Sequence, residues 1–325
     1  MDESNTLTEW LRSLRLAETQ SLGGLTIVAV RSAAAPGDGL AYHTLAEALA
    51  AGDVEVTEKA QASVPGLQVV NGGDVPLLLL DGEEVVGGRQ NRVVNTTVLV
   101  PAHATFDLDV TCVEHGRWFE VASAFAPGEA VYPSLRGQKA RQVSAALEAR
   151  TGARADQHTV WGEIATRQRR AGTVAPTAAL NDLYAQRSEW LARAEARFTV
   201  VDGAVGVIAV LGGRARCADI FDQPATLRAY WSRLVRSYAL EADGVGEAIG
   251  MAQDSAGRLL ARAARAARRE FSSRGLGVDT RLSGSGIVGA ALVHRDVVVH
   301  TAIFRQTRSR RPIRRPAERA LRLER

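Results

Sequence analysis

The sequence predicts an α+β fold in which a β-rich N-terminal half, a helical middle and a C-terminal β-hairpin pack into one domain. Between residues 25 and 114, short β-rich segments are separated by Gly, Pro, Asp and Asn, which is typical of strands. Apolar residues then recur at helical spacing from Ser134 to about residue 195. Two β-rich segments, 284–295 and 297–304, close this part of the chain. Because strands and helices occupy separate regions, the order indicates α+β.

The chain is divided into three regions. Residues 1–22 are predicted to form a short amphipathic helix at the domain edge, since apolar residues from Leu7 to Leu14 recur at near-helical spacing. The single α+β domain is expected over 23–305. The last region, 306–325, is basic and lacks a core-forming pattern, so it is predicted to be a disordered tail.

The first half of the domain predicts short strands of two kinds. The leucine run at 77–80 shows no polar alternation, so it should be buried on both faces. From Ala104 to Glu114 apolar and polar residues alternate, which puts Cys112 on the apolar face. The expected strands are 25–30, 42–45, 53–58, 67–71, 75–80, 97–100 and 104–114.

Helical spacing predominates in the second half of the domain. A strand pair is expected at 196–211, because Asp202 and Gly203 tolerate the positive φ of a tight hairpin turn. The final two strands are expected to turn at Arg295 and Asp296. The expected helices are 138–153, 156–172, 177–195, 224–240 and 244–271.

Composition favours a globular cytoplasmic protein. The 325 residues are 46% hydrophobic, enough for a sizeable core, yet no run of about eighteen apolar residues suggests a membrane segment. The first residues are polar and acidic, unlike a secretory signal. Cys112 and Cys217 are the only cysteines, so a disulfide framework is excluded.

The basic character of the chain is confined to its end. The pI of about 9.4 would suit a nucleic-acid or membrane partner. Residues 305–325 contain nine Arg and two Glu, a net charge of +7, which leaves −3 for the rest of a chain whose total is +4. Lysine occurs only twice, and a compositional bias of the genome explains the arginines as readily as phosphate recognition does.

Unusual chemistry is concentrated between Gly87 and Asn95. Glycines let backbone N–H groups approach a ligand oxygen that a Cβ would block, and arginines form paired hydrogen bonds with carboxylates or phosphates. Amide side chains donate and accept, which suits a nucleotide or a sugar. A polar network that pins the sheet, or a solvated loop, would explain the same pattern. The predicted ligand-binding residues here are Gly87, Gly88, Arg89, Gln90, Asn91, Arg92 and Asn95.

Four further residues are expected to face this loop. Glu83 and Glu114 are the candidate catalytic carboxylates, as general bases or as partners of the loop arginines. Arg117 and Trp118 are candidates for holding a ligand ring or for a cation–π pair. Convergence of these residues with Arg92 in one concave pocket would support a ligand site, whereas a closed network of mutual contacts would oppose it.

Neither a metal site nor a cysteine nucleophile is favoured. Zinc needs at least three protein ligands, and the histidines are scattered without ligand spacing. Cys112 lies on a predicted buried face, where the pKa of a thiol rises. The sequence identifies no cofactor.

Several segments together resemble the ARG and rhodanese-phosphatase-superfamily-associated protein family, a domain of unknown function. The strongest are GlyGlyArgGlnAsnArg at 87–92 and CysValGluHisGlyArgTrp at 112–118, and the resemblance runs from about Leu25 to Phe304. It implies a role near NAD or ADP-ribose metabolism and supplies no established catalytic residues. Looser matches are GlyGlu at 82–83, AspIlePhe at 219–221, SerTyrAla at 237–239 and ValValHisThrAlaIlePhe at 298–304.

These observations leave three functional hypotheses. The first is a site that binds or processes a phosphorylated, ADP-ribose-like small molecule; if catalytic, hydrolysis or group transfer with a carboxylate base is the least demanding chemistry. The second is a non-catalytic interaction or structural module in NAD or ADP-ribose-related systems. The third is nucleic-acid binding through the tail, for which deletion of 306–325 would abolish salt-sensitive DNA retention.

Overall fold

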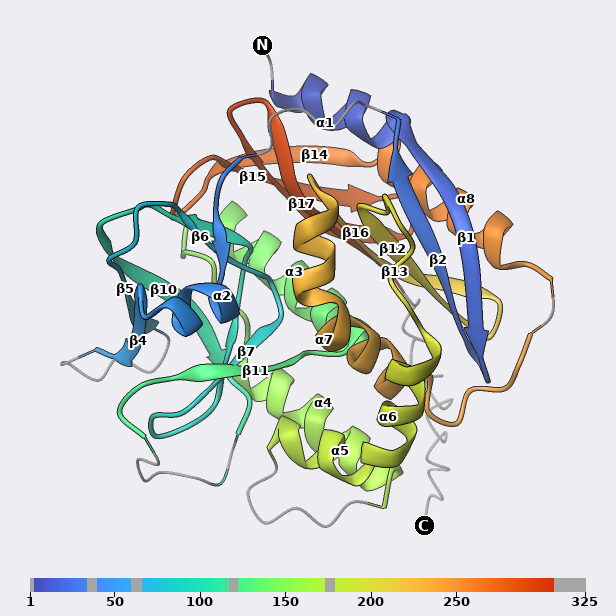
Figure 1. Ribbon diagram of the computed structural model, residues 1–325, viewed down its shortest axis with the longest axis horizontal. Coiled ribbons are helices and arrows are strands. Elements are labelled where there is room, and N and C mark those ends of the chain that lie inside the picture. Colours follow the sequence, from blue (N-terminus) through green and yellow to red (C-terminus); the bar gives the residue numbers. More distant parts are fainter. Residues whose placement is uncertain are drawn as a thin grey trace, which may run out of the picture.

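A computed structural model describes residues 3–33, 40–59, 66–114, 116, 122–172, 179–248 and 250–306 of the chain. Within these residues, helices and mostly antiparallel strands form an α+β protein with three sheets (Figure 1), as the sequence predicts. Most of the predicted tail lies outside the described residues, so its disorder and its nucleic-acid binding stay predictions.

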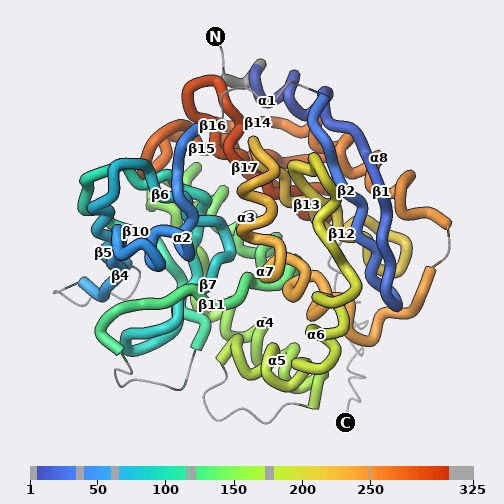
Figure 2. Tube along the Cα trace, in the orientation of Figure 1, coloured from blue at the N-terminus to red at the C-terminus, as the bar shows by residue number. Residues whose placement is uncertain are grey.

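The largest sheet joins strands from both ends of the described chain. Its eight strands run in the order β1-β2-β12-β13-β17-β16-β15-β14, so N-terminal strands pair with strands from the middle of the chain (Figure 2). Their bounds are β1 Leu14–Leu22, β2 Leu25–Ser32, β12 Gly206–Leu211, β13 Arg214–Phe221, β14 Ala267–Ser272, β15 Val278–Gly284, β16 Ile287–His294 and β17 Val297–Arg305.

Two smaller sheets are built from the first half of the chain. One has the order β11-β7-β8-β10-β5-β4 and the other β3-β6-β9. The leucines at 77–80 are at most 3% exposed, which confirms the strand buried on both faces. The bounds are β3 His43–Thr44, β4 Val54–Glu58, β5 Gly66–Asn71, β6 Leu77–Leu79, β7 Glu83–Val86, β8 Arg92–Val94, β9 Val98–Val100, β10 Ala104–Cys112 and β11 Ala126–Ala130.

Helices cover both faces of the large sheet. Leucines of α1 and α8 pack on one face, and α7 packs on the other, where its core merges with residues of the smaller sheets (Figure 1). No helix in the described part of the chain combines the length and the apolarity that crossing a membrane requires. The bounds are α1 Glu3–Ser13, α2 Leu45–Ala51, α3 Pro133–Glu148, α4 Gln157–Arg170, α5 Leu180–Gln186, α6 Ser188–Arg197, α7 Pro224–Ala242 and α8 Ala252–Ala264.

The predicted helix over residues 1–22 is too long. The helix ends at Ser13, and residues 14–22 form β1, which pairs with β2 across a turn at Gly23 and Gly24. The helical spacing of leucines extends past Ser13, but pairing with β2 satisfies the backbone of this segment, and a local periodicity cannot reveal a strand partner.

Two other predicted elements are corrected in the same way. Asp202 and Gly203 do not turn a hairpin, because β12 begins at Gly206 and turns into β13 at 212–213. The predicted helix 244–271 ends at Ala264, and β14 follows it. The expected turn at Arg295 and Asp296 is confirmed, with φ angles of 51° and 60° between β16 and β17.

Candidate functional site

The glycine pair of the sequence motif lies where the chain leaves β7 and passes close to the segment before β11. Gly87 has a φ of 152° and Gly88 a φ of 51°. A Cβ on Gly87 would lie 2.7 Å from the carbonyl oxygen of Ala124, and one on Gly88 would lie 2.5 Å from the Phe125 ring. The need for glycine here therefore has a packing explanation that requires no ligand.

The polar side chains after the glycines bond to one another. The Gln90 amide donates to the carbonyl oxygen of Glu114 over 2.9 Å, and its Oε1 accepts from Cys112 Sγ at 2.9 Å and from Arg92 Nη1 at 3.1 Å. The backbone N–H of Asn91 donates to Glu114 Oε2 over 3.2 Å. All five residues are buried, so this part of the motif forms a buried network of mutual contacts.

One donor in this network is left over. Nε of Arg92 is buried and has no hydrogen-bond partner among the described residues. Burial raises the pKa of the Cys112 thiol, as predicted, and the nearby Arg92 guanidinium partly offsets the rise. Cys112 is thus a neutral hydrogen-bond donor in the network and not an activated nucleophile.

Glu84 adds a second carboxyl group to the network. Asn91 Nδ2 lies 3.5 Å from Glu84 Oε1, and the backbone N–H of Glu129 donates to Glu84 Oε2 over 3.2 Å. Burial raises the pKa of Glu84 to about 8, and the nearby Glu129 and Glu114 carboxylates add to the rise. A protonated carboxyl beside a second carboxyl suits acid–base chemistry, but Glu84 is fully buried and Glu114 is 5% exposed.

Glu83 contacts a different part of the molecule. Its carboxylate accepts from Arg233 Nη1 at 2.5 Å, from the backbone N–H of Leu80 at 3.1 Å and from the Tyr230 hydroxyl at 3.4 Å. Successive residues of a strand point to opposite faces. Glu83 therefore packs against α7, whereas its neighbour Glu84 reaches the motif loop.

Of the remaining predicted residues, Asn95 has a structural role and Arg89 lies at the surface. Asn95 bonds to Thr111 and to the carbonyl oxygen of Ala153, which ties β8 to β10 and to the segment before α4. The Arg89 side chain is more than half exposed, and its Nε lies 3.9 Å from Glu58 Oε2. Arg117 and Trp118 lie outside the described residues, so their ligand role stays a prediction.

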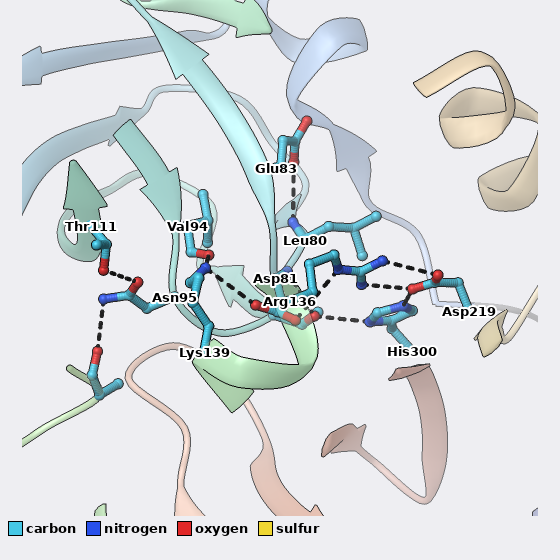
Figure 3. A network of polar contacts seen from close by, with 12 residues as sticks. Leu80, Asp81, Glu83, Val94, Asn95, Thr111, Arg136, Lys139, Asp219 and His300 are labelled. Carbon is cyan, nitrogen blue, oxygen red and sulfur yellow. Dashed lines mark hydrogen bonds and ion pairs between the residues drawn. The ribbon is translucent and has the colours of Figure 1, made fainter. Parts of the chain in front are cut away.

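A larger buried ionic network, which the sequence did not indicate, joins the smaller sheets to the large sheet (Figure 3). Arg136 of α3 donates two hydrogen bonds to Asp219 of β13, at 2.7 and 3.0 Å, and its Nε lies 3.7 Å from Asp81. Lys139, one turn along α3, lies 3.5 Å from Asp81 and donates to the Val94 carbonyl oxygen over 2.7 Å.

The ion pairs of this network set its charge states. Burial opposes the ionisation of Asp219, but Arg136 and the nearby His300 imidazole, whose Nε2 lies 3.4 Å from Oδ1 of Asp219, hold its pKa well below the usual range. Burial lowers the pKa of Lys139 to about 8, and the Asp81 carboxylate limits the fall. Every one of these side chains is at most 9% exposed, so the network acts as an internal brace.

Two open cavities away from these networks are lined by arginines. One, of about 450 Å³, lies between α8 and the start of β13. Arg258 and Arg262 reach it from α8, Arg214 from β13, and Arg305 from the end of β17. In the described part of the chain none of the four forms an ion pair with a carboxylate. The other lining residues are Gly212, Gly213, Ala215, Ala248, Met251, Ser255 and Leu259.

Two sequence signals could have drawn attention to this cavity. Arg258 and Arg262 are four residues apart on a predicted helix and so share a face. Arg214 follows a glycine pair directly. Arg305, however, is more than forty residues from all of them in sequence, so its approach depends on the strand order β13-β17.

The comparisons with known proteins identify a family. No curated protein and no solved structure matches the chain. The sequence model of the ARG and Rhodanese-Phosphatase-superfamily-associated Protein domain, ARPP-1, matches residues 13–304. Among the described residues, no group of three or more His, Cys, Asp or Glu is arranged to hold a metal ion. Because the match spans nearly the whole chain, the protein belongs to the ARPP-1 domain family.

Proposed function

We propose that the protein binds a phosphorylated small molecule in the cavity between α8 and β13, through Arg214, Arg258, Arg262 and Arg305. The observation that carries this proposal is the gathering of four arginines, without a carboxylate partner in the described chain, around about 450 Å³ of open space. Ligand sites for small molecules fall in this size range. Guanidinium groups match phosphate oxygens with paired, charge-assisted hydrogen bonds.

The repulsion among these arginines supports an anionic occupant. Burial lowers the pKa of Arg305, and the positive charges of Arg262, Arg214, Arg216 and Arg258 lower it further. Like charges held close together destabilise the empty protein, and a bound anion removes that cost. An anion should therefore bind with a favourable contribution from every arginine.

The rest of the lining favours an organic phosphate and binding without catalysis. Met251 is 52% exposed and, with Leu259, offers an apolar contact to the unphosphorylated part of a ligand. Among the described residues that line the cavity none is Asp, Glu, His or Cys, so none of them supplies a general acid or base. The hydroxyl of Ser255 already accepts a hydrogen bond from Ala215.

A thermal-shift screen tests the proposal. We expect a compound among NAD, ADP-ribose, nucleotides and phosphosugars to raise the melting temperature of the full chain, because a ligand that binds only the folded state stabilises it by about 2.7 kcal/mol at a hundred times its Kd. The double variant Arg258→Gln with Arg262→Gln should lose this shift. Without ligand, the same variant should be as stable as the natural chain or more so, because repulsion is relieved.

Two further variants locate the ligand. Arg197→Gln with Arg265→Gln removes the same charge from exposed arginines that line neither arginine cavity, and should keep the shift. Arg92→Ala should keep it too. Loss of the shift in Arg92→Ala alone would instead place the ligand at the motif loop, where the buried Arg92 Nε has no hydrogen-bond partner in the described part of the chain.

The alternative function is a non-catalytic interaction or structural module. It is favoured by the mutual hydrogen bonds of Gln90, Asn91 and Glu114, which leave the motif as a support for the sheet. A panel that stabilises neither the natural chain nor any variant would support this alternative and contradict ligand binding at both sites.

A further inference from the structure

A second arginine-lined cavity adjoins the first. It has a volume of about 300 Å³ and lies between α3, α4 and the end of the large sheet. Arg141 reaches it from α3, Arg170 from α4 and Arg216 from β13, and none of the three forms an ion pair in the described chain. Arg167 also lines it, but this arginine lies 3.6 Å from Glu241, so its charge is partly neutralised.

Arg305 lines both cavities. It ends β17, which pairs with β13. The register of β13 against β12 shifts between Ala215 and Cys217, so Arg216, at the shift, lines the second cavity although Arg214, two residues earlier, lines the first. Two residues of a strand span about 7 Å. Arginines that form no ion pair in the described chain therefore continue from the α8 side of the sheet to the α3–α4 side.

The lining of both cavities indicates what kind of polyanion fits. In the part of the chain that the structure describes, no Phe, Tyr or Trp lines either cavity. Sites for single-stranded nucleic acids use aromatic side chains on which bases stack. Two acidic residues, Glu163 and Glu241, also line the second cavity, and Glu241 is engaged by Arg167 and Ser134. Phosphate groups, without bases, match this chemistry best.

We propose that the two cavities form one continuous site for an oligophosphate chain, which runs from Arg258 and Arg262 past Arg305 to Arg141 and Arg170. The inference rests on the proposed function, because it assigns the first phosphates of the chain to the cavity between α8 and β13. It adds the ligand class: a linear chain of phosphates, free or attached to an organic group, that is long enough to reach both faces of the sheet.

Calorimetric titration at physiological salt with orthophosphate, pyrophosphate, tripolyphosphate and a longer polyphosphate tests the inference. We expect the affinity of the full chain to rise about tenfold or more from pyrophosphate to the longer chains, as arginines of the second cavity are reached. Arg141→Gln with Arg170→Gln should abolish this gain. Arg258→Gln with Arg262→Gln should weaken all four ligands.

The remaining outcomes overturn one claim or the other. An affinity that does not depend on chain length, or a gain that survives in Arg141→Gln with Arg170→Gln, contradicts the continuous site but leaves the first cavity intact. If the control Arg197→Gln with Arg265→Gln loses as much affinity as the cavity variants, the attraction is non-specific, which also contradicts the continuous site. Tighter binding of a single-stranded oligonucleotide of equal charge contradicts the ligand class. No binding of any phosphate contradicts the proposed function itself.

Discussion

Replacement of Arg136 by Met should lower the free energy of unfolding by about 3–5 kcal/mol, the loss seen when one partner of a buried ion pair is removed. Asp219 would keep the Tyr238 hydroxyl, which donates to it at 2.5 Å, but would lose both guanidinium hydrogen bonds. Asp81 would lose one of its two cations. Denaturant unfolding of the natural chain and the variant measures the difference.

A double variant separates charge from packing. The aliphatic part of Arg136 lies against Gly82, and its guanidinium lies 4.9 Å from the centre of the Phe304 ring, so Met preserves much of the volume. Asp219→Asn with Arg136→Met should recover about 1–2 kcal/mol relative to Arg136→Met alone, because no unpaired charge stays buried at position 219. If the free energy of unfolding of Arg136→Met lies within 1 kcal/mol of that of the natural chain, the ion pair contributes little to stability.

Glu84 should make the protein less stable as the pH rises through the neutral range. Its pKa is about 8 in the folded state and about 4.5 when unfolded. Below pH 4.5 the Glu84 carboxyl is protonated in both the folded and the unfolded protein, and its contribution to stability is fully present. Between these values only the folded state holds the proton, so each unit of pH lowers the free energy of unfolding by about 1.4 kcal/mol, roughly 5 kcal/mol in all.

The variant Glu84→Gln isolates this effect. Its side chain has no titrating proton, so the difference in free energy of unfolding between variant and natural chain should grow in the variant's favour from pH 5 to pH 9. Other buried acids, such as Asp222, contribute equally to both proteins, so their contribution cancels when the two free energies of unfolding are subtracted at each pH. Glu148→Gln, which changes an exposed carboxylate, should give a constant difference. A constant difference for Glu84→Gln as well would mean that Glu84 is ionised when folded.

Local signals in the sequence predicted elements whose partners are close in the chain. The leucines at 77–80 and the turn at Arg295 and Asp296 are examples, because burial on both faces and positive φ leave marks on the residues themselves. The leucine spacing of segment 14–22 predicts a helix. The prediction is wrong because pairing with β2, which the spacing does not reveal, makes this segment a strand. The prediction of a hairpin turn at Asp202 and Gly203 is wrong, because the chain turns at the glycine pair Gly212 and Gly213 instead.

The candidate site was harder to predict, since it depends on which face each side chain takes. Sequence placed Glu83 and Glu84 side by side, and only the pairing of β7 shows that Glu84 reaches the motif loop and Glu83 reaches α7. Arg214, Arg258 and Arg305 belong to three separate elements, so no spacing rule brings them together. Arginine content alone could not distinguish a lined cavity from a basic surface.

The brace around Arg136 also bears on how fast the protein folds and unfolds. It joins Asp81, Arg136, Asp219 and His300, which lie on four segments spread over most of the chain. Such contacts form only after long loops have closed, so they should be absent from the folding transition state. Arg136→Met should then accelerate unfolding while the refolding rate stays nearly unchanged, as stopped-flow kinetics would measure. The brace thus prolongs the lifetime of the folded state without speeding its formation.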